Sequence, residues 1–157
     1  MKKKPSPSSK PAPVVWTLKV ECVWGAYLKE RPCIRVIEIP EDASLDDLHG
    51  AVQGAVEFEN DHPYEFYAGR QPFSRKVTYG EPPESPFAIP EFADIPLNQV
   101  FPLPERMKLY YWFDFGDDWT FQITKERKVK PLEARVRYPR VVERVGPNPV
   151  QYPPFEG

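Results

Sequence analysis

Apolar and polar residues alternate along two segments near the start of the chain. In residues 14–24 one side is apolar and consists of Val14, Trp16, Leu18, Val20 and Cys22. Residues 33–39 alternate in the same way. A period of two is typical of a strand with one buried face. Because a short connection separates the two runs, we expect them to pair as a hairpin.

The period changes after Pro40. Apolar residues then recur every three or four positions, at Leu45, Leu48, Val52, Ala55 and Val56. This stripe predicts a helix of about three turns that ends near Phe58. Ser44 and Asp47 have the spacing of a capping box, and acidic residues in the first turn suit the positive end of the helix dipole.

The remaining regular segments are shorter and are separated by prolines. We expect a strand over residues 64–67, a turn of helix within residues 92–101, and a strongly aromatic strand over residues 107–115. A returning strand contains Trp119, Phe121 and Ile123. The Pro-rich residues 71–90 are interpreted as a long surface loop, because proline cannot donate to a strand ladder and breaks helices.

This order predicts an α+β fold: a mixed β-sheet with one main helix packed across it. The sequence of hairpin, helix, strand, short helix and strand is β-grasp-like, with an added C-terminal hairpin strand and arm. Residues 1–13 are rich in Lys, Ser and Pro, and we expect them to be a disordered tail. Residues 14–157 are expected to form a single domain, as a chain of 157 residues can.

Composition bounds the environment of the protein. Hydrophobic residues make up 41% of the chain, yet no run approaches the ~18 apolar residues that a membrane span requires. The lysine-rich start is not followed by the apolar stretch of a signal peptide. We therefore expect a cytoplasmic protein without a membrane partner.

Two cysteines, Cys22 and Cys33, lie in neighbouring predicted strands and could face each other across the hairpin. Two thiols do not make a disulfide framework, and a domain of this size does not need one. We expect reduced side chains, with a redox or structural pair as the alternative.

Charge is unevenly distributed although the net charge is only −2. Residues 38–65 contain no Lys or Arg, whereas basic residues dominate residues 125–144. Candidate binding residues in the second segment are Arg127, Lys128, Lys130, Arg135, Arg137 and Arg140. Beside Tyr138 they could contact a nucleic-acid backbone and stack on bases, although the isoelectric point of about 5.8 is low for a nucleic-acid module. Such charge can also simply favour solubility.

Candidate metal ligands are the two histidines and the acidic residues of the predicted hairpin turn, namely His49, His62, Asp114, Asp117 and Asp118. Two imidazoles and a carboxylate can bind a divalent metal. The structural alternative is that His49 packs at the border of the helix stripe and hydrogen-bonds to the backbone, and that His62 caps a carbonyl group in a turn. No nucleophile elbow, phosphate loop or dinucleotide-binding motif occurs, and we expect no cofactor.

The predicted turn also has a purely structural interpretation. Gly116 is expected to supply a positive φ, and Asp114 and Asp117 to accept hydrogen bonds from backbone amides. Trp119 and Phe115 can cover the hairpin end. The exposed contact surface is then expected at the aromatic hairpin and the loop over residues 71–90, with contacts made by Tyr110, Trp112 and Trp119.

Three spaced motifs indicate a family. The chain contains Leu48-His49 in the helix, Asn60-Asp61-His62 after it, and Asp114-Phe-Gly-Asp-Asp-Trp119 in the hairpin turn. Together with Tyr138-Pro139 they resemble the plasmid pRiA4b ORF-3-like family from about Trp16 onward. The resemblance implies bacterial or archaeal proteins, many carried near mobile elements, with no proven reaction. The chain departs from the family at Phe121, where a histidine is usual, and in its last residues.

We interpret the protein as a non-enzymatic binding or interaction module with a protein partner. One alternative is a nucleic-acid-associated protein linked to mobile elements. The other is a metal-dependent enzyme that uses both histidines and the aspartates of the turn.

Overall fold

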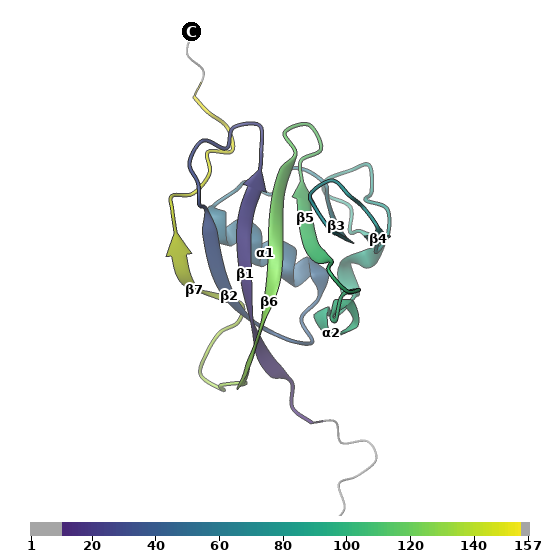
Figure 1. Ribbon diagram of the computed structural model, residues 1–157, viewed down its shortest axis with the longest axis vertical. Coiled ribbons are helices and arrows are strands. Elements are labelled where there is room, and N and C mark those ends of the chain that lie inside the picture. Colours follow the sequence, from purple (N-terminus) through teal and green to yellow (C-terminus); the bar gives the residue numbers. More distant parts are fainter. Residues whose placement is uncertain (1–10, 155–157) are drawn as a thin grey trace, which may run out of the picture.

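A long antiparallel pair, β1 (Val14–Trp24) and β6 (Trp119–Pro131), forms the middle of the structure (Figure 1). The computed structural model describes residues 11–154. Their seven strands form one sheet in the order β4-β3-β5-β6-β1-β2-β7. The remaining strands are β2 (Ile34–Pro40), β3 (Tyr64–Gly69), β4 (Val77–Thr78), β5 (Lys108–Phe113) and β7 (Arg140–Val145).

The α+β class is confirmed, but the expectation of a mixed sheet is wrong. Every pair of neighbouring strands in the described residues is antiparallel. The reason is that β6 lies between β5 and β1 and runs antiparallel to both. The two strands that share a direction, β1 and β5, are therefore not neighbours in the sheet. The likeness to a β-grasp domain stays a prediction.

The helix α1 (Leu45–Val56) begins as the capping box predicts. The backbone amide of Asp47 donates to the Ser44 hydroxyl, and the Asp47 carboxylate accepts from the Ser44 amide. Glu57 ends the helix in the left-handed conformation. Two short helical segments, η1 (Glu91–Asp94) and α2 (Leu97–Val100), follow the long loop.

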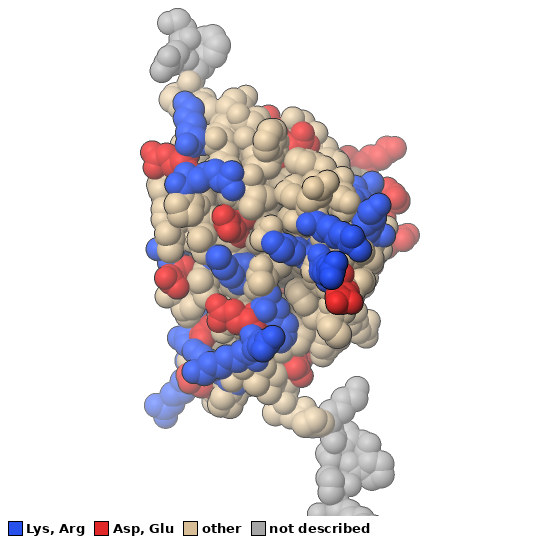
Figure 2. Space-filling model, viewed as in Figure 1, with Lys and Arg blue, Asp and Glu red and all other residues tan. Residues whose placement is uncertain are grey.

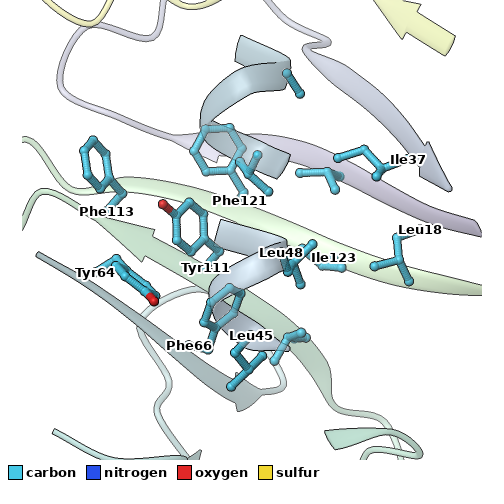
Figure 3. Packing of buried hydrophobic residues seen from close by; sticks show 14 of the residues in the cluster. Leu18, Ile37, Leu45, Leu48, Tyr64, Phe66, Tyr111, Phe113, Phe121 and Ile123 are labelled. Carbon is cyan, nitrogen blue, oxygen red and sulfur yellow. The ribbon is translucent and has the colours of Figure 1, made fainter. Parts of the chain in front are cut away.

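The core lies between α1 and one face of the sheet (Figures 1 and 3). Leu45 and Leu48 from the helix meet strand residues such as Leu18, Ile37 and Ile123, all of them buried. The opposite face of the sheet has no helix over it in the described residues (Figure 1). α1 therefore fixes which strand residues are core and which face outward.

The predicted tail lies almost wholly outside the described residues, which begin at residue 11. In residues 11–154 no helix is long and apolar enough to cross a membrane.

Candidate functional site

His49 belongs to a buried hydrogen-bond network between α1 and the sheet. Its Nδ1 lies 2.5 Å from the Tyr111 hydroxyl, and its Nε2 lies 2.9 Å from Oδ1 of Asn60. Gln53 donates to the same hydroxyl, which leaves that hydroxyl to donate to His49. Burial lowers the pKa of His49 to about 4. His49 is thus a neutral imidazole, and its partners are side chains rather than the expected backbone groups.

His62 lies in a second, more open cluster at the end of the sheet where the β5–β6 hairpin turns. Its Nε2 is 2.8 Å from the Tyr152 hydroxyl and 3.3 Å from Oδ2 of Asp114. The Tyr152 hydroxyl donates to Asp61, which leaves its oxygen to accept from Nε2–H of His62. Burial, followed by the nearby Asp61 carboxylate, raises the pKa of Tyr152. His62 therefore contacts side chains of other segments, and within residues 11–154 it caps no carbonyl group.

The β5–β6 turn is built by its aspartates rather than by the backbone of Gly116. The positive φ angles belong to Asp114 (64°) and Asp118 (57°), so the expectation of a positive φ at Gly116 is wrong. Aspartate enters the left-handed region more readily than most residues. The Asp114 carboxylate accepts from the amides of residues 116 and 117, as predicted for this residue. A Cβ at Gly116 would lie 3.4 Å from Oδ1 of Asp114, an ordinary van der Waals distance, so neither space nor backbone conformation requires glycine there.

The predicted metal ligands do not gather as one set. The two ring nitrogens of His49 are engaged in the first network, while His62 and Asp114 lie in the second. Burial, followed by repulsion from Asp114, raises the pKa of Asp117, and Asp118 accepts from the indole N–H of Trp112. Residues 11–154 contain no group of three or more His, Cys, Asp or Glu side chains that could hold a metal ion.

Two of the predicted contact aromatics are buried, which corrects their assignment to an exposed surface. Trp119 is 0% exposed because it points to the helix side, where it packs on Phe58 and against Gly25. Tyr110 is 1% exposed and stacks on Tyr67. Both support the sheet and neither is available to a partner.

Trp112 is half-buried, and the predicted surface loop explains part of this. Residues 71–90 contain β4, and the loop folds over the helix-free face beside β3. Phe73 meets Trp112 edge to face, and its amide donates to the Tyr67 hydroxyl. Arg75 forms an ion pair with Glu65, whose side chain is 2% exposed. The loop thus covers the aromatic strands that the sequence placed on the surface.

The predicted basic residues lie at the far end of β6, in the β6–β7 connection and at the start of β7. We call this set the basic surface: Arg127, Lys128, Lys130, Arg135, Arg137 and Arg140. All six are exposed, and Figure 2 shows Lys and Arg gathered over this part of the helix-free side. Lys130 and Arg140 hold the buried Glu38 carboxylate, each at 2.6 Å. Hydrogen bonding to Lys130 lowers the pKa of Glu38.

Cys22 and Cys33 are both buried and form no disulfide. The amide of Cys22 donates to the Cys33 carbonyl at 2.9 Å, so the two residues are neighbours across the hairpin, as predicted. Burial raises the pKa of both thiols, which keeps them protonated and unreactive at neutral pH.

The sequence matches the family described as plasmid pRiA4b ORF-3-like protein over residues 26–151. The chain belongs to this family. No curated protein matches it. It is also similar to the crystal structure of a protein of unknown function, MM3350 from Methanosarcina mazei Go1, with 26% identity and a TM-score of 0.62. That similarity covers 85% of this chain and 70% of the other.

In this pRiA4b ORF-3-like protein the motif residues of three distant segments meet at one end of the sheet. Asn60 contacts His49, His62 contacts Asp114, and both imidazoles lie near the ring of Phe113. We call His49, Asn60, Asp61, His62, Asp114 and Trp119 the signature end. Each of these residues except Trp119 has at least one side-chain atom within hydrogen-bond distance of another residue, whereas the Trp119 indole nitrogen is buried without a partner in the described residues.

Sequence reasoning missed several residues that complete these clusters. Tyr111 was predicted only as a strand residue, and Gln151, which accepts from the Glu59 amide, was not singled out. Arg35 is 2% exposed and donates to the carbonyl of Ala55 and to Asn148. A signal for Arg35 existed, because it occupies the buried phase of the alternating residues 33–39.

Proposed function

We propose that this pRiA4b ORF-3-like protein is a cytoplasmic, non-enzymatic binding module that contacts an acidic protein through its basic surface. The observation that carries the proposal is the content of that surface. Exposed cations alternate there with exposed aliphatic side chains: Val129, Leu132 and Val142 are 45–48% exposed. Four of the six cations have no role in the packing of the described residues.

The mixture of aliphatic and basic side chains favours a protein over a nucleic acid. Single-stranded nucleic acids bind to aromatic faces on which bases stack. In the described part of the basic surface the neighbouring aromatic residue is Tyr138, and the Arg140 guanidinium already lies over its ring at 5.8 Å. Aliphatic side chains that alternate with cations suit instead a protein surface that is acidic and partly apolar.

The signature end supports the non-enzymatic part of the proposal. His49 is buried with both ring nitrogens engaged, and Asp114 is 5% exposed and hydrogen-bonded within its own turn. No hydroxyl or thiol of Ser, Thr or Cys contacts His62 in residues 11–154. These residues account for a stable sheet end without a substrate.

The test is a capture experiment with matched charge variants. The full chain, the variant Arg127→Glu/Arg137→Glu, and the control Lys19→Glu/Lys76→Glu are immobilised and exposed to an extract of the source organism. Both pairs reverse two exposed cations, but the control pair lies outside the basic surface. We expect an acidic protein that the wild type and the control retain and the first variant loses.

The captured protein is then purified and titrated against the three chains. A dissociation constant that rises at least tenfold for Arg127→Glu/Arg137→Glu alone supports the proposal. Equal affinity for all three chains contradicts it. Parallel titrations with single- and double-stranded oligonucleotides at low and physiological salt test the other class of partner. Tight, salt-dependent oligonucleotide binding that the first variant abolishes would replace the protein partner with a nucleic acid.

A further inference from the structure

A groove of about 490 Å³ lies between the start of β1, the middle of β6 and the segment that leads from α2 into β5. Its apolar lining includes Trp16, Phe101, Leu103, Met107 and Ile123. Trp16 and Phe101 meet edge to face at 5.7 Å, which fixes the inner wall. The volume falls within the range of about 300–1,000 Å³ that is typical of small-molecule sites.

The rim of the groove is cationic. Arg106, Lys108 and Lys125 line it, whereas Glu105 is the one acidic lining residue in the described part of the chain. None of the three cations forms an ion pair within residues 11–154. Lys125 instead lies over the Trp16 ring, with its Nζ 4.7 Å from the ring centroid. The lining of the groove therefore carries an excess of positive charge.

Arg106 adds a local feature to this rim. It is exposed and has a φ of 65°, a left-handed backbone conformation that is strained for a residue with a side chain. Such strained positions cluster at sites where ligands bind. The left-handed backbone lies next to Met107, so one turn brings an apolar side chain and a cation to the same groove.

We infer that this groove binds a small amphiphilic organic anion: an aromatic or aliphatic body seated against Trp16 and Leu103, with a carboxylate, sulfonate or phosphate at the cationic rim. Charge complementarity selects this occupant. The N-terminal segment of the same chain is a poor match, because residues 1–10 carry four lysines and no acidic residue. The inference is independent of the proposed protein partner, since the groove and the basic surface share none of their named residues.

The first experiment uses the fluorescent anion anilinonaphthalene sulfonate with the full chain at neutral pH. We expect saturable binding at one site per chain. Lys108→Glu and Lys125→Glu should each weaken that binding at least tenfold, because they reverse the charge at the rim. Lys19→Glu and Lys76→Glu are the matched controls at exposed positions outside the groove and the basic surface, and both should leave the affinity unchanged. Unaltered binding by the two rim variants would overturn the inference.

Uncharged N-phenylnaphthylamine separates the contribution of charge from that of the apolar wall. It should bind the wild type at least tenfold more weakly than the anion does. Its affinity should be the same for the wild type and for Lys108→Glu. Equal affinity for both probes would mean that the groove does not select an anion. Circular dichroism of each variant verifies folding. Arg106→Glu, at an exposed loop position, provides a third rim variant if either lysine variant fails to fold.

The site is located by the indole N–H resonances of the four tryptophans, with Trp16 assigned through Trp16→Phe. Addition of the sulfonate should shift the Trp16 resonance and leave that of Trp119 in place, since Trp119 is fully buried. A shift confined to other tryptophans would contradict the groove as the site. Competition by benzoate, phenyl phosphate and decanoate then distinguishes carboxylate from phosphate and aromatic from aliphatic ligands.

Discussion

The signature end and the basic surface use polar residues in opposite ways. At the signature end the side chains of His49 and Asp114 are buried and have partners in distant segments. On the basic surface Arg127 and Arg137 are exposed, and the residues around them are aliphatic and exposed as well. Most motif residues that point to the family thus lie at the signature end, whereas the basic surface is represented among the motifs only by its neighbours Tyr138 and Pro139.

The largest expected effect tests whether the signature end is structural. Trp119→Ala should lower the free energy of unfolding by about 3–5 kcal/mol, because it removes a fully buried ring that packs on Phe58. Trp112→Ala, in the same hairpin, removes a half-buried ring and should cost about 1–2 kcal/mol. Urea unfolding followed by circular dichroism measures both. Equal losses in the free energy of unfolding would contradict the distinction between the fully buried Trp119 and the half-buried Trp112.

The next prediction concerns His49 and acid. Its folded-state pKa of about 4 lies below the ordinary histidine value of about 6.5. The unfolded chain therefore binds the proton first, and stability is lost as the pH falls from about 6.5 toward 4. The loss from this residue should be about 3 kcal/mol over that window.

Unfolding curves at several pH values for the wild type and for His49→Gln measure this contribution. It is the difference between the two chains in how steeply the free energy of unfolding changes with pH. His62→Gln is the control, because it removes the other histidine and leaves the buried network intact. A wild type and a His49→Gln variant with the same pH dependence would show that His49 is not held neutral.

Glu38 connects the basic surface to the sheet, and its loss should have an intermediate effect. Glu38→Gln removes the buried partner of Lys130 and Arg140 and should cost about 2 kcal/mol, the usual scale for hydrogen bonds to a charged group. Since the folded-state pKa of Glu38 is lowered, its contribution is complete above the ordinary glutamate pKa of about 4.3 and disappears as the pH falls below it. Glu143→Gln, at an exposed position of β7, is the control in the same urea titration.

The smallest expected effect belongs to the basic surface itself. Arg127→Glu and Arg137→Glu should each change the free energy of unfolding by about 0.5 kcal/mol or less, because both side chains are exposed and make no ion pair within residues 11–154. Thermal unfolding is a sufficient measurement. A loss of several kcal/mol would assign these residues a role in the fold and weaken the case for a partner surface.

Much of the fold could be predicted from local patterns. The alternation in residues 14–24 gave the bounds of β1, and the stripe after Ser44 gave α1 with its capping box. The antiparallel direction of β6 against β1 could not be read in the same way. Strand direction depends on which segments pair across about a hundred residues of chain, and periodicity carries no information about that pairing.

The candidate sites were less predictable than the fold. The sequence singled out His62 and Asp114 as candidate metal ligands, and the structure places them side by side in a hydrogen-bonded cluster. That cluster is completed by Asp61 and by Tyr152 from the far end of the described chain. The partial burial of Trp112 depends on how the irregular loop over residues 71–90 folds back, and that loop has no periodic pattern of apolar residues from which its path could be predicted. The groove beside Trp16 likewise exists only after distant segments have met.

The central pairing of β1 with β6 has a consequence for how the protein is made. The ribosome releases the β1–β2 hairpin first, yet its neighbours β6 and β7 are among the last elements to be synthesised. Until β6 and β7 have been synthesised, the β1–β2 hairpin and α1 have no strand paired to the outer edges of β1 and β2. Nascent chains with such unpaired strand edges are prone to aggregate. We therefore expect cells to require a chaperone on this chain more during translation than after its release.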